Sequence, residues 1–356
     1  MKTKNLATGF AILAAALYAV NVPLSKLLLN HVQPTMMAAL LYLGAGVGML
    51  LYSLIGKALG QTTIKEPLTK KELPYTVAMV VLDIAAPIFL MLGIARTNSA
   101  NVSLLNNFEI VATSLIAFFV FKEVLSRRLV FAIVLVTLGS VILGFEGEGS
   151  FAFNTGSLFV LAACVCWGLE NNCTKMISSK SSVEIVIIKG CGSGLGSLIV
   201  ALILGERLPA ILWIFCALAL GFVAYGLSIT FYIMAQKHLG AAKTSAYYSV
   251  APFLGVAFSM LLLGERPGLQ FWAAVVIMVA ATVLMVKDTV TLQHTHAHTH
   301  THTHEHRHGD LVHTHEHTHE HTHIHTHGQQ EESHTHKHGN LSGHDHSHPD
   351  LSGSGA

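Results

Sequence analysis

Charge is scarce in this chain. Of its 356 residues, 52% are hydrophobic and only 12% are charged, about half the charged share of an average soluble domain. The formal net charge is +1, so no strong charge field points to nucleic acid as a partner. A soluble domain of this length cannot bury so much apolar surface, and the composition therefore predicts a membrane protein with several spans.

Cysteine is also scarce, and motifs for catalysis are absent. The five cysteines lie within or beside apolar runs, where an odd number fits small packing residues better than a disulfide framework. No Gly-x-x-x-x-Gly-Lys-Ser/Thr loop for nucleotide phosphates occurs, and no nucleophile–base pair is evident. These absences predict a protein that is not an enzyme and that does not hydrolyse ATP.

Long apolar runs are what the sequence has instead. In lipid a backbone must satisfy its own hydrogen bonds, so each run is expected to be a helix. Basic residues gather in alternate connections, which places the N-terminus and, after ten spans, the C-terminal tail in the cytoplasm. The expected fold is an all-α polytopic protein of the cell membrane, with the lipid bilayer as a partner. Its ten segments are residues 6–28, 34–56, 74–95, 99–121, 128–145, 156–176, 182–204, 209–235, 242–263 and 269–287.

The chain repeats itself. Three short matches recur in the same order, and they pair residues 18–26 with 167–175, 44–48 with 192–196, and 122–123 with 264–265. The glycines of the second match predict close helix packing. Each half has an odd number of segments, so the second half enters the membrane from the opposite face and the repeats are inverted. The expected units are residues 6–145, residues 156–287 and a tail over residues 291–356.

A run of small residues that leads to a glutamate closes the fourth segment of each half. In the second half it reads Ala-Ala-Lys-Thr-Ser-Ala-Tyr-Tyr-Ser-Val-Ala-Pro over residues 241–252, then Leu-Leu-Leu-Gly-Glu. In the first half Glu109 stands where Ala251 stands in the second. With the tandem ten-span layout, the chain resembles the drug/metabolite transporter superfamily, and specifically tandem EamA-type domains. The resemblance implies a secondary transporter that moves a small metabolite, such as an amino acid, by alternating access.

Three carboxylates fall inside apolar segments, in the third, fourth and sixth. A charge at the bilayer centre costs roughly 2.5–3.5 kcal/mol, so such groups face a cavity or a partner. One interpretation is a polar cavity at mid-depth that binds a cationic or zwitterionic substrate, or a coupling proton. The alternative is a set of internal ion pairs with Lys26, Lys175 or Lys189. The expected cavity residues are Asn21, Asp83, Asn106, Glu109, Glu170, Asn171, Tyr247 and Tyr248.

Histidine is concentrated in the tail, which holds 22 of the 24 histidines of the chain. Neutral imidazoles bind zinc, nickel, cobalt and copper, so the tail predicts several exchangeable transition-metal sites. Its low complexity and few apolar residues predict disorder without metal. A pH-sensitive solubilising tail is the alternative. The expected ligands are His294, His296, His298, His300, His302, His304, His306, His313, His315, His317, His319, His321, His323, His325 and His327.

Three functions remain open at this point. The core exports a small metabolite, or it carries a divalent metal ion that the tail supplies or senses, or the tail is a membrane-tethered metal buffer. His238, near the end of the eighth segment, is the only histidine in the apolar segments. Metal paths usually combine acids with histidines, which favours the metabolite. No cofactor is expected for the core, and a transition metal is expected at the tail.

Overall fold

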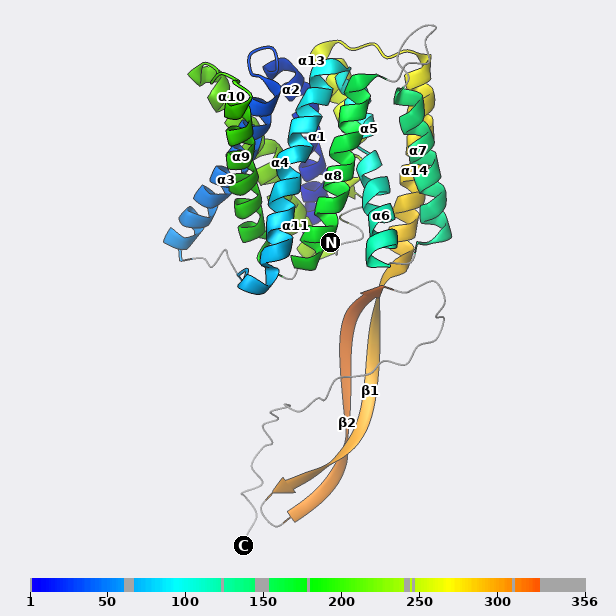
Figure 1. Cartoon of the computed structure of the whole chain (residues 1–356). Helices are drawn as coiled ribbons and strands as arrows, with labels where there is room; N and C mark the ends of the chain where they lie inside the picture. The colour runs from blue at the N-terminus through cyan, green and yellow to red at the C-terminus, as the bar shows by residue number, and fades with distance from the viewer. Residues whose placement is uncertain are drawn as a thin grey trace.

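The computed structural model describes residues 2–60, 67–122, 125–144, 154–177, 180–239, 244, 247–308 and 311–326. Within them, helices stand side by side as a bundle, and a two-stranded hairpin follows the last helix (Figure 1). The N-terminus and the hairpin lie at the same end of the bundle, which we call the N-terminal side. The opposite end is called the far side.

The first half of the bundle makes five passes, two of which consist of two helices each. The helices are α1 (Lys2–Ala19) with α2 (Asn21–Leu28), α3 (Pro34–Ala58), α4 (Leu73–Arg96), α5 (Ser99–Leu105) with α6 (Phe108–Phe121), and α7 (Arg127–Gly144). A short 3₁₀ turn, η1 (Lys70–Glu72), precedes α4.

The second half also makes five passes. They consist of α8 (Thr155–Ile177), α9 (Ser182–Ile203), α10 (Ile211–Gly221) with the π-helical turn η2 (Phe222–Leu227) and α11 (Ser228–Leu239), α13 (Ala251–Leu263), and α14 (Leu269–Leu292). The first helix, α1, runs toward the far side, whereas α8 starts at the far side and runs back (Figure 1). The two halves therefore enter the bundle from opposite ends.

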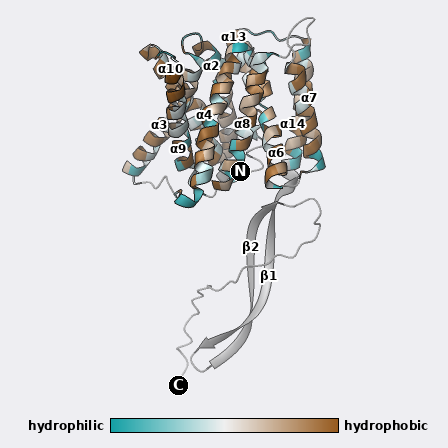
Figure 2. Cartoon of the chain, viewed as in Figure 1, coloured by the Kyte–Doolittle hydropathy of each residue, from teal (hydrophilic) through white to brown (hydrophobic). Residues whose placement is uncertain are grey.

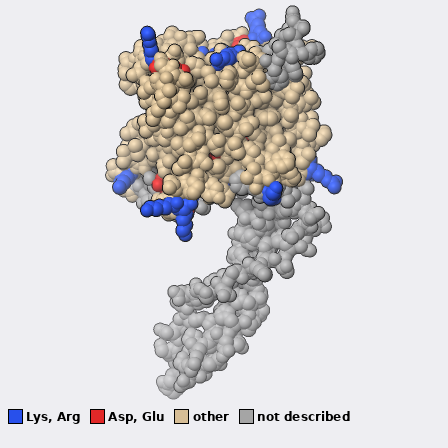
Figure 3. All heavy atoms as spheres, in the orientation of Figure 1, with Lys and Arg blue, Asp and Glu red and all other residues tan. Residues whose placement is uncertain are grey.

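The surface of the bundle is apolar around its middle. Eight helical segments of the described chain are long and apolar enough to cross a membrane, and α13 is a shorter apolar helix. Large hydrophobic side chains such as Leu261 and Val276 are 78% and 70% exposed. Hydrophobic residues cover the helices while hydrophilic ones gather at their ends (Figure 2), and Lys and Arg lie at the two ends of the face shown in Figure 3. This surface suits lipid, and the fold is that of an all-α membrane bundle.

The main hydrophobic core lies between mid-depth and the far side. It includes Met36 and Met37 at the start of α3, Met91 and Ile94 at the end of α4, and Leu104 in α5, all fully buried. The positions in α3 and α4 are at the far-side ends of these helices, and α5 forms the far-side part of its pass. The bundle is therefore densely packed at its far side.

The two halves meet in a glycine contact between α3 and α9. A Cβ atom added at Gly46 would lie 2.4 Å from the backbone nitrogen of Cys191, and one added at Gly190 would lie 2.4 Å from the backbone nitrogen of Gly46. Gly194 likewise meets the backbone nitrogen of Leu43 at 2.7 Å. The helices approach backbone to backbone, which only residues without a side chain allow.

The tail differs from the disordered segment expected from its composition. Strands β1 (Gln293–His308) and β2 (Leu311–Thr326) pair antiparallel along their whole length. The expectation of disorder rested on the lack of an apolar face. It gave too little weight to the strict recurrence of histidine at every second residue, with threonine, a residue that favours strands, as the commonest residue in between. Residues 327–356, including His327, lie outside the described part.

Candidate functional site

Several passes of the described chain are interrupted near mid-depth, and three of these interruptions lie within the described helices. The first changes from α1 to α2 at Val20, the fourth breaks between α5 and α6 at Asn106 and Asn107, and the eighth contains the π-helical turn η2. Interrupted helices and π turns free backbone groups from the regular ladder and recur at functional sites. All three interruptions lie beside one cavity.

This cavity has a volume of about 410 Å³, within the range of small-molecule sites. Both halves of the chain line it. The walls come from α1, α3, α6, α8, α9, η2 and the start of α13, and they include Tyr18, Tyr42, Trp167, Tyr225 and Tyr248 as aromatic side chains. The cavity therefore combines a broad aromatic lining with a few polar groups.

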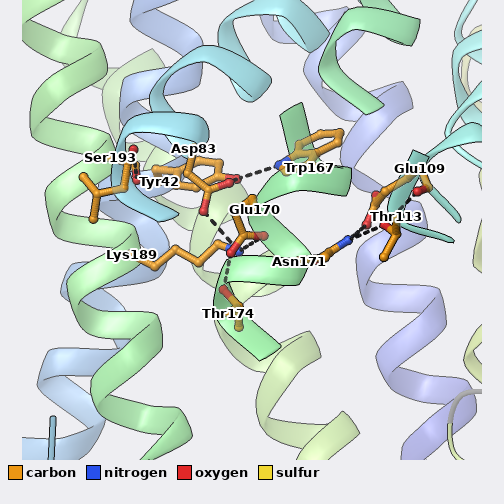
Figure 4. Close-up of polar contacts among 11 residues, drawn as sticks. Tyr42, Asp83, Glu109, Thr113, Trp167, Glu170, Asn171, Thr174, Lys189 and Ser193 are labelled. Atoms are coloured by element: carbon orange, nitrogen blue, oxygen red, sulfur yellow. Dashed lines mark hydrogen bonds and ion pairs between the residues drawn. The ribbon is translucent and has the colours of Figure 1, made fainter. Parts of the chain in front are cut away.

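A lysine and two acids form a charged cluster at one wall of the cavity (Figure 4). Lys189 Nζ in α9 lies 3.1 Å from Asp83 Oδ2 in α4 and 3.0 Å from Glu170 Oε2 in α8. The two carboxylates are 0% and 1% exposed, while the lysine side chain is 23% exposed. The Tyr42 hydroxyl donates to Asp83 Oδ1 at 3.2 Å, and the Thr174 hydroxyl donates to Glu170. This cluster joins three helices and carries one net negative charge when all its members are ionised.

Glu109 stands apart from that cluster. Asn171 Nδ2 donates a hydrogen bond to Glu109 Oε1 at 2.7 Å and another to the Thr113 hydroxyl at 3.2 Å. No cation of the described residues lies within ion-pair distance of Glu109. This half-buried carboxylate in the cavity wall thus has a hydrogen-bond donor but no counter-ion among the described residues.

Aromatic residues of the cavity wall pack on one another across the contact between the two halves. The ring centroids of Tyr18 and Tyr225 are 5.9 Å apart in an edge-to-face arrangement, and those of Tyr42 and Tyr225 are 5.5 Å apart. Asn21 Nδ2 donates to the Tyr225 hydroxyl at 2.9 Å. Because Tyr225 belongs to η2, the π turn brings a residue of the second half against the first half.

Five of the eight residues expected at the cavity line it: Asn106, Glu109, Glu170, Asn171 and Tyr248. Asn21 is buried behind the cavity-lining Tyr225, to whose hydroxyl it donates a hydrogen bond. Asp83 is buried behind Lys189, and Tyr247 is 40% exposed and does not contribute to the lining. Adjacent helical residues point about 100° apart, so Tyr247 and Tyr248 do not face the same space.

The pairing of acids and lysines also differs from the expectation of one lysine for each acid. Lys189 serves both Asp83 and Glu170. Lys26 Nζ instead donates to the carbonyl oxygens of Ile94 and Thr97, at 2.5 and 2.8 Å, where α4 ends at the far side. A cation at the carboxyl end of a helix is electrostatically favourable.

Two glutamates at the far side connect the two halves by accepting hydrogen bonds from backbone N–H groups. Glu265, after α13, accepts hydrogen bonds from the backbone nitrogens of Ser99 and Ala100, both at 2.8 Å, at the start of α5. Glu206, after α9, accepts from the backbone nitrogens of Thr35 and Met36, at 3.2 and 2.6 Å, at the start of α3. Each carboxylate satisfies donors that the first turn of a helix leaves free. With the dense core beneath them, these contacts close the far side of the bundle.

Metal binding inside the bundle finds no support. Among the residues whose side chains the structure describes, no group of three or more His, Cys, Asp and Glu could hold a metal ion. Glu170 is committed to Lys189 and Thr174.

A helical bundle in two oppositely entering halves, with a cavity at the interrupted helices between them, is an arrangement typical of membrane transporters. The sequence profile of the EamA-like transporter family matches residues 5–145 and 154–287. The chain belongs to this family.

Two similar proteins extend the comparison. An uncharacterized transporter of Methanothermobacter thermautotrophicus (strain ATCC 29096 / DSM 1053 / JCM 10044 / NBRC 100330 / Delta H) is 26% identical over 276 residues, which cover 71% of this chain and 78% of that protein. A protein of known crystal structure superposes with a TM-score of 0.58 at 18% identity, covering 80% of this chain and 97% of that one. That second likeness concerns the fold alone.

Proposed function

We propose that this protein is a secondary transporter that exports a small metabolite bearing an ammonium group, such as an amino acid, by alternating access at the central cavity. The observation that carries the proposal is Glu109, a cavity-lining carboxylate with a hydrogen bond from Asn171 and no described counter-ion. An ammonium group of the substrate would supply the missing positive charge.

The charge balance of the cavity supports a substrate with a positive group. Lys189 already pairs with two carboxylates, so Glu109 adds a further negative charge when ionised. The aromatic lining strengthens this preference, because the face of an aromatic ring attracts a cation. Tyr18 and Trp167 both line the space that Glu109 borders.

The start of α13 favours the carboxylate of such a metabolite. Ala251 and Pro252 open this helix beside the cavity, and the amino end of a helix carries partial positive charge. The helix at the matching place of the first half, α6, has Glu109 in its first turn, whereas α13 has no acidic residue there. A zwitterion could place its ammonium group toward Glu109 and its carboxylate toward α13.

The distribution of basic residues supports one membrane orientation. The N-terminal side carries more of them, which favours a cytoplasmic location for this side. The core and the contacts of Glu206 and Glu265 pack the far side, so with this orientation the described state would exclude the outer solution. The basic residues at the N-terminal side include Lys57, Lys70, Lys71, Arg127, Arg128 and Lys180, against Lys26, Arg96, Arg207 and Arg266 at the far side.

Transport tests the proposal in proteoliposomes that hold the full chain. We expect saturable exchange of at least one radiolabelled amino acid or primary amine from a panel. Glu109→Gln should weaken its transport roughly ten- to a hundredfold, since a hydrogen bond to a charged group contributes about 1.5–3 kcal/mol. Glu72→Gln, the same change in a residue outside the cavity, is the matched control and should transport normally.

Other outcomes would overturn the proposal. Transport restricted to neutral or anionic metabolites, or unchanged amine transport by Glu109→Gln, would remove the role of that carboxylate. Flux of zinc, nickel or cobalt in the same vesicles, with no organic substrate, would favour the metal transporter instead. A proton gradient imposed in either direction shows whether proton movement is coupled to the substrate.

A further inference from the structure

We infer that the tail is a transition-metal site built from cross-strand pairs of histidines, with its ligands fixed by the hairpin register. The inference concerns the tail alone and stands whether or not the core transports an amine. The ions that fit it are the imidazole-binding divalent metals zinc, nickel, cobalt and copper.

The alternation of the sequence places the histidines on one face of each strand. Every second residue of β1 from His294 to His308 is histidine, and so is every second residue of β2 from His313 to His325. Residues two apart in a strand share a face, because successive side chains alternate between faces. Each strand therefore has a face made of histidine positions.

The register then brings these two rows opposite each other. His296 pairs with His323, and His298 pairs with His321. A slip of one residue would pair every histidine with a residue of another type. Seven pairs join histidine to histidine: His294 with His325, His296 with His323, His298 with His321, His300 with His319, His302 with His317, His304 with His315, and His306 with His313.

The residues of the other face are of a different kind. Thr299 pairs with Glu320, and Thr303 pairs with Glu316. The histidine positions thus share one face of the hairpin, and the positions of the other face are mainly threonine with some acidic residues. The last pair of the register joins His308 to Leu311, and two residues of the sequence, Gly309 and Asp310, lie between the strands.

The spacing of such a ladder suits four-coordinate binding. Directly opposite Cβ atoms in an antiparallel pair are about 4.5–5.5 Å apart, and residues two apart along a strand are separated by about 6.8 Å. Two adjacent pairs, such as His296 with His323 and His298 with His321, therefore place four histidine positions at the corners of a rectangle of this size. Zinc takes four ligands in a tetrahedron at about 2.0–2.1 Å from each nitrogen. Seven pairs offer room for about three such ions.

The competing explanation is that neighbouring histidines of a single strand bind the metal. Two full-length variants with equal numbers of tail histidines distinguish this explanation from the cross-strand site. The unpaired variant keeps all eight histidines of β1 and none of β2. It carries His313→Thr, His315→Thr, His317→Thr, His319→Thr, His321→Thr, His323→Thr and His325→Thr.

The paired variant also loses seven histidines but keeps two sets of adjacent pairs. One set is formed by His296, His298, His321 and His323, and the other by His304, His306, His313 and His315. Its substitutions are His294→Thr, His300→Thr, His302→Thr, His308→Thr, His317→Thr, His319→Thr and His325→Thr. Threonine is chosen because it favours strands.

Zinc binding to the purified full-length proteins is measured by competition with a chromophoric chelator. A variant in which all fifteen hairpin histidines become threonine gives the background from the remaining histidines. We expect the paired variant to bind about two zinc ions above background, and the unpaired variant to bind at least about tenfold more weakly. Equal binding by both variants would show local chelation and refute the cross-strand site. Binding by neither variant above background would refute it as well.

Discussion

Lys189 provides the sharpest test of how the bundle holds its buried charges. Replacing it by methionine removes the cation that faces Asp83 and Glu170 at 3.1 and 3.0 Å and keeps a long apolar side chain. Both carboxylates are almost fully buried and have no other described cation at that distance. Lys189→Met should therefore destabilise the protein strongly.

The magnitude follows from the geometry. At an effective dielectric constant of about 20, an ion pair at 3.0 Å contributes roughly 5 kcal/mol before the cost of desolvating its members. Removing one partner of a buried pair costs about 3–5 kcal/mol, because the other charge is left uncompensated. The lysine side chain is 23% exposed toward the cavity, so the lower end, about 3 kcal/mol, is expected.

The loss of stability is measured as a decrease in the free energy of unfolding in mixed detergent micelles. Lys57→Met, at an exposed lysine of α3, is the control and should stay within about 0.5 kcal/mol of the unmodified protein. A triple variant with Lys189→Met, Asp83→Asn and Glu170→Gln has no charge left in this cluster, and it should recover most of the stability. A loss below about 1 kcal/mol in the single variant, or no recovery in the triple one, would refute the reasoning.

Other substitutions test the remaining contacts. Gly46→Ala places a Cβ atom 2.4 Å from the backbone of α9 and should cost about 1–3 kcal/mol in the same unfolding assay. The control is Gly9→Ala, where nothing lies within 4 Å of the added atom, and it should be neutral or stabilising. Equal effects of the two substitutions would exclude the backbone contact as the cause. Glu265→Ala removes the acceptor for the first amides of α5 and should cost about 0.5–2 kcal/mol. Hydrogen exchange should quicken at Ser99 and Ala100, and unchanged protection there would show that the carboxylate is dispensable.

Much of the bundle could be predicted from the sequence because each pass is an apolar run with polar flanks. The expected segments and the observed helices overlap in all ten passes. The interruptions were harder to predict. Nothing in the run over residues 209–235 marks η2 as a π turn, because such turns arise from packing against neighbouring helices rather than from composition.

The charged residues of the site were found more readily than its aromatic ones. Glu109 and Glu170 stand out in the sequence because carboxylates inside apolar runs are costly and rare. Tyr42 and Tyr225 give no such signal, since an aromatic residue in a span suits lipid, core or cavity equally well. The double pairing of Lys189 depends on α4, α8 and α9 meeting at one depth, and this is a tertiary relation that periodicity does not contain.

The glycine contact has a consequence for the integrity of the chain. It joins α3 of the first half to α9 of the second through bare backbone, and the cavity walls come from both halves. Gly144 and Asn154, the described residues on either side of the link between the halves, are not among the residues of that contact or of the cavity lining. Two polypeptides produced separately from this gene, divided within that link, should recognise each other as subunits do and reconstitute a working protein. A bulky residue at Gly46 would then act as an assembly defect, distinct from any loss of substrate binding.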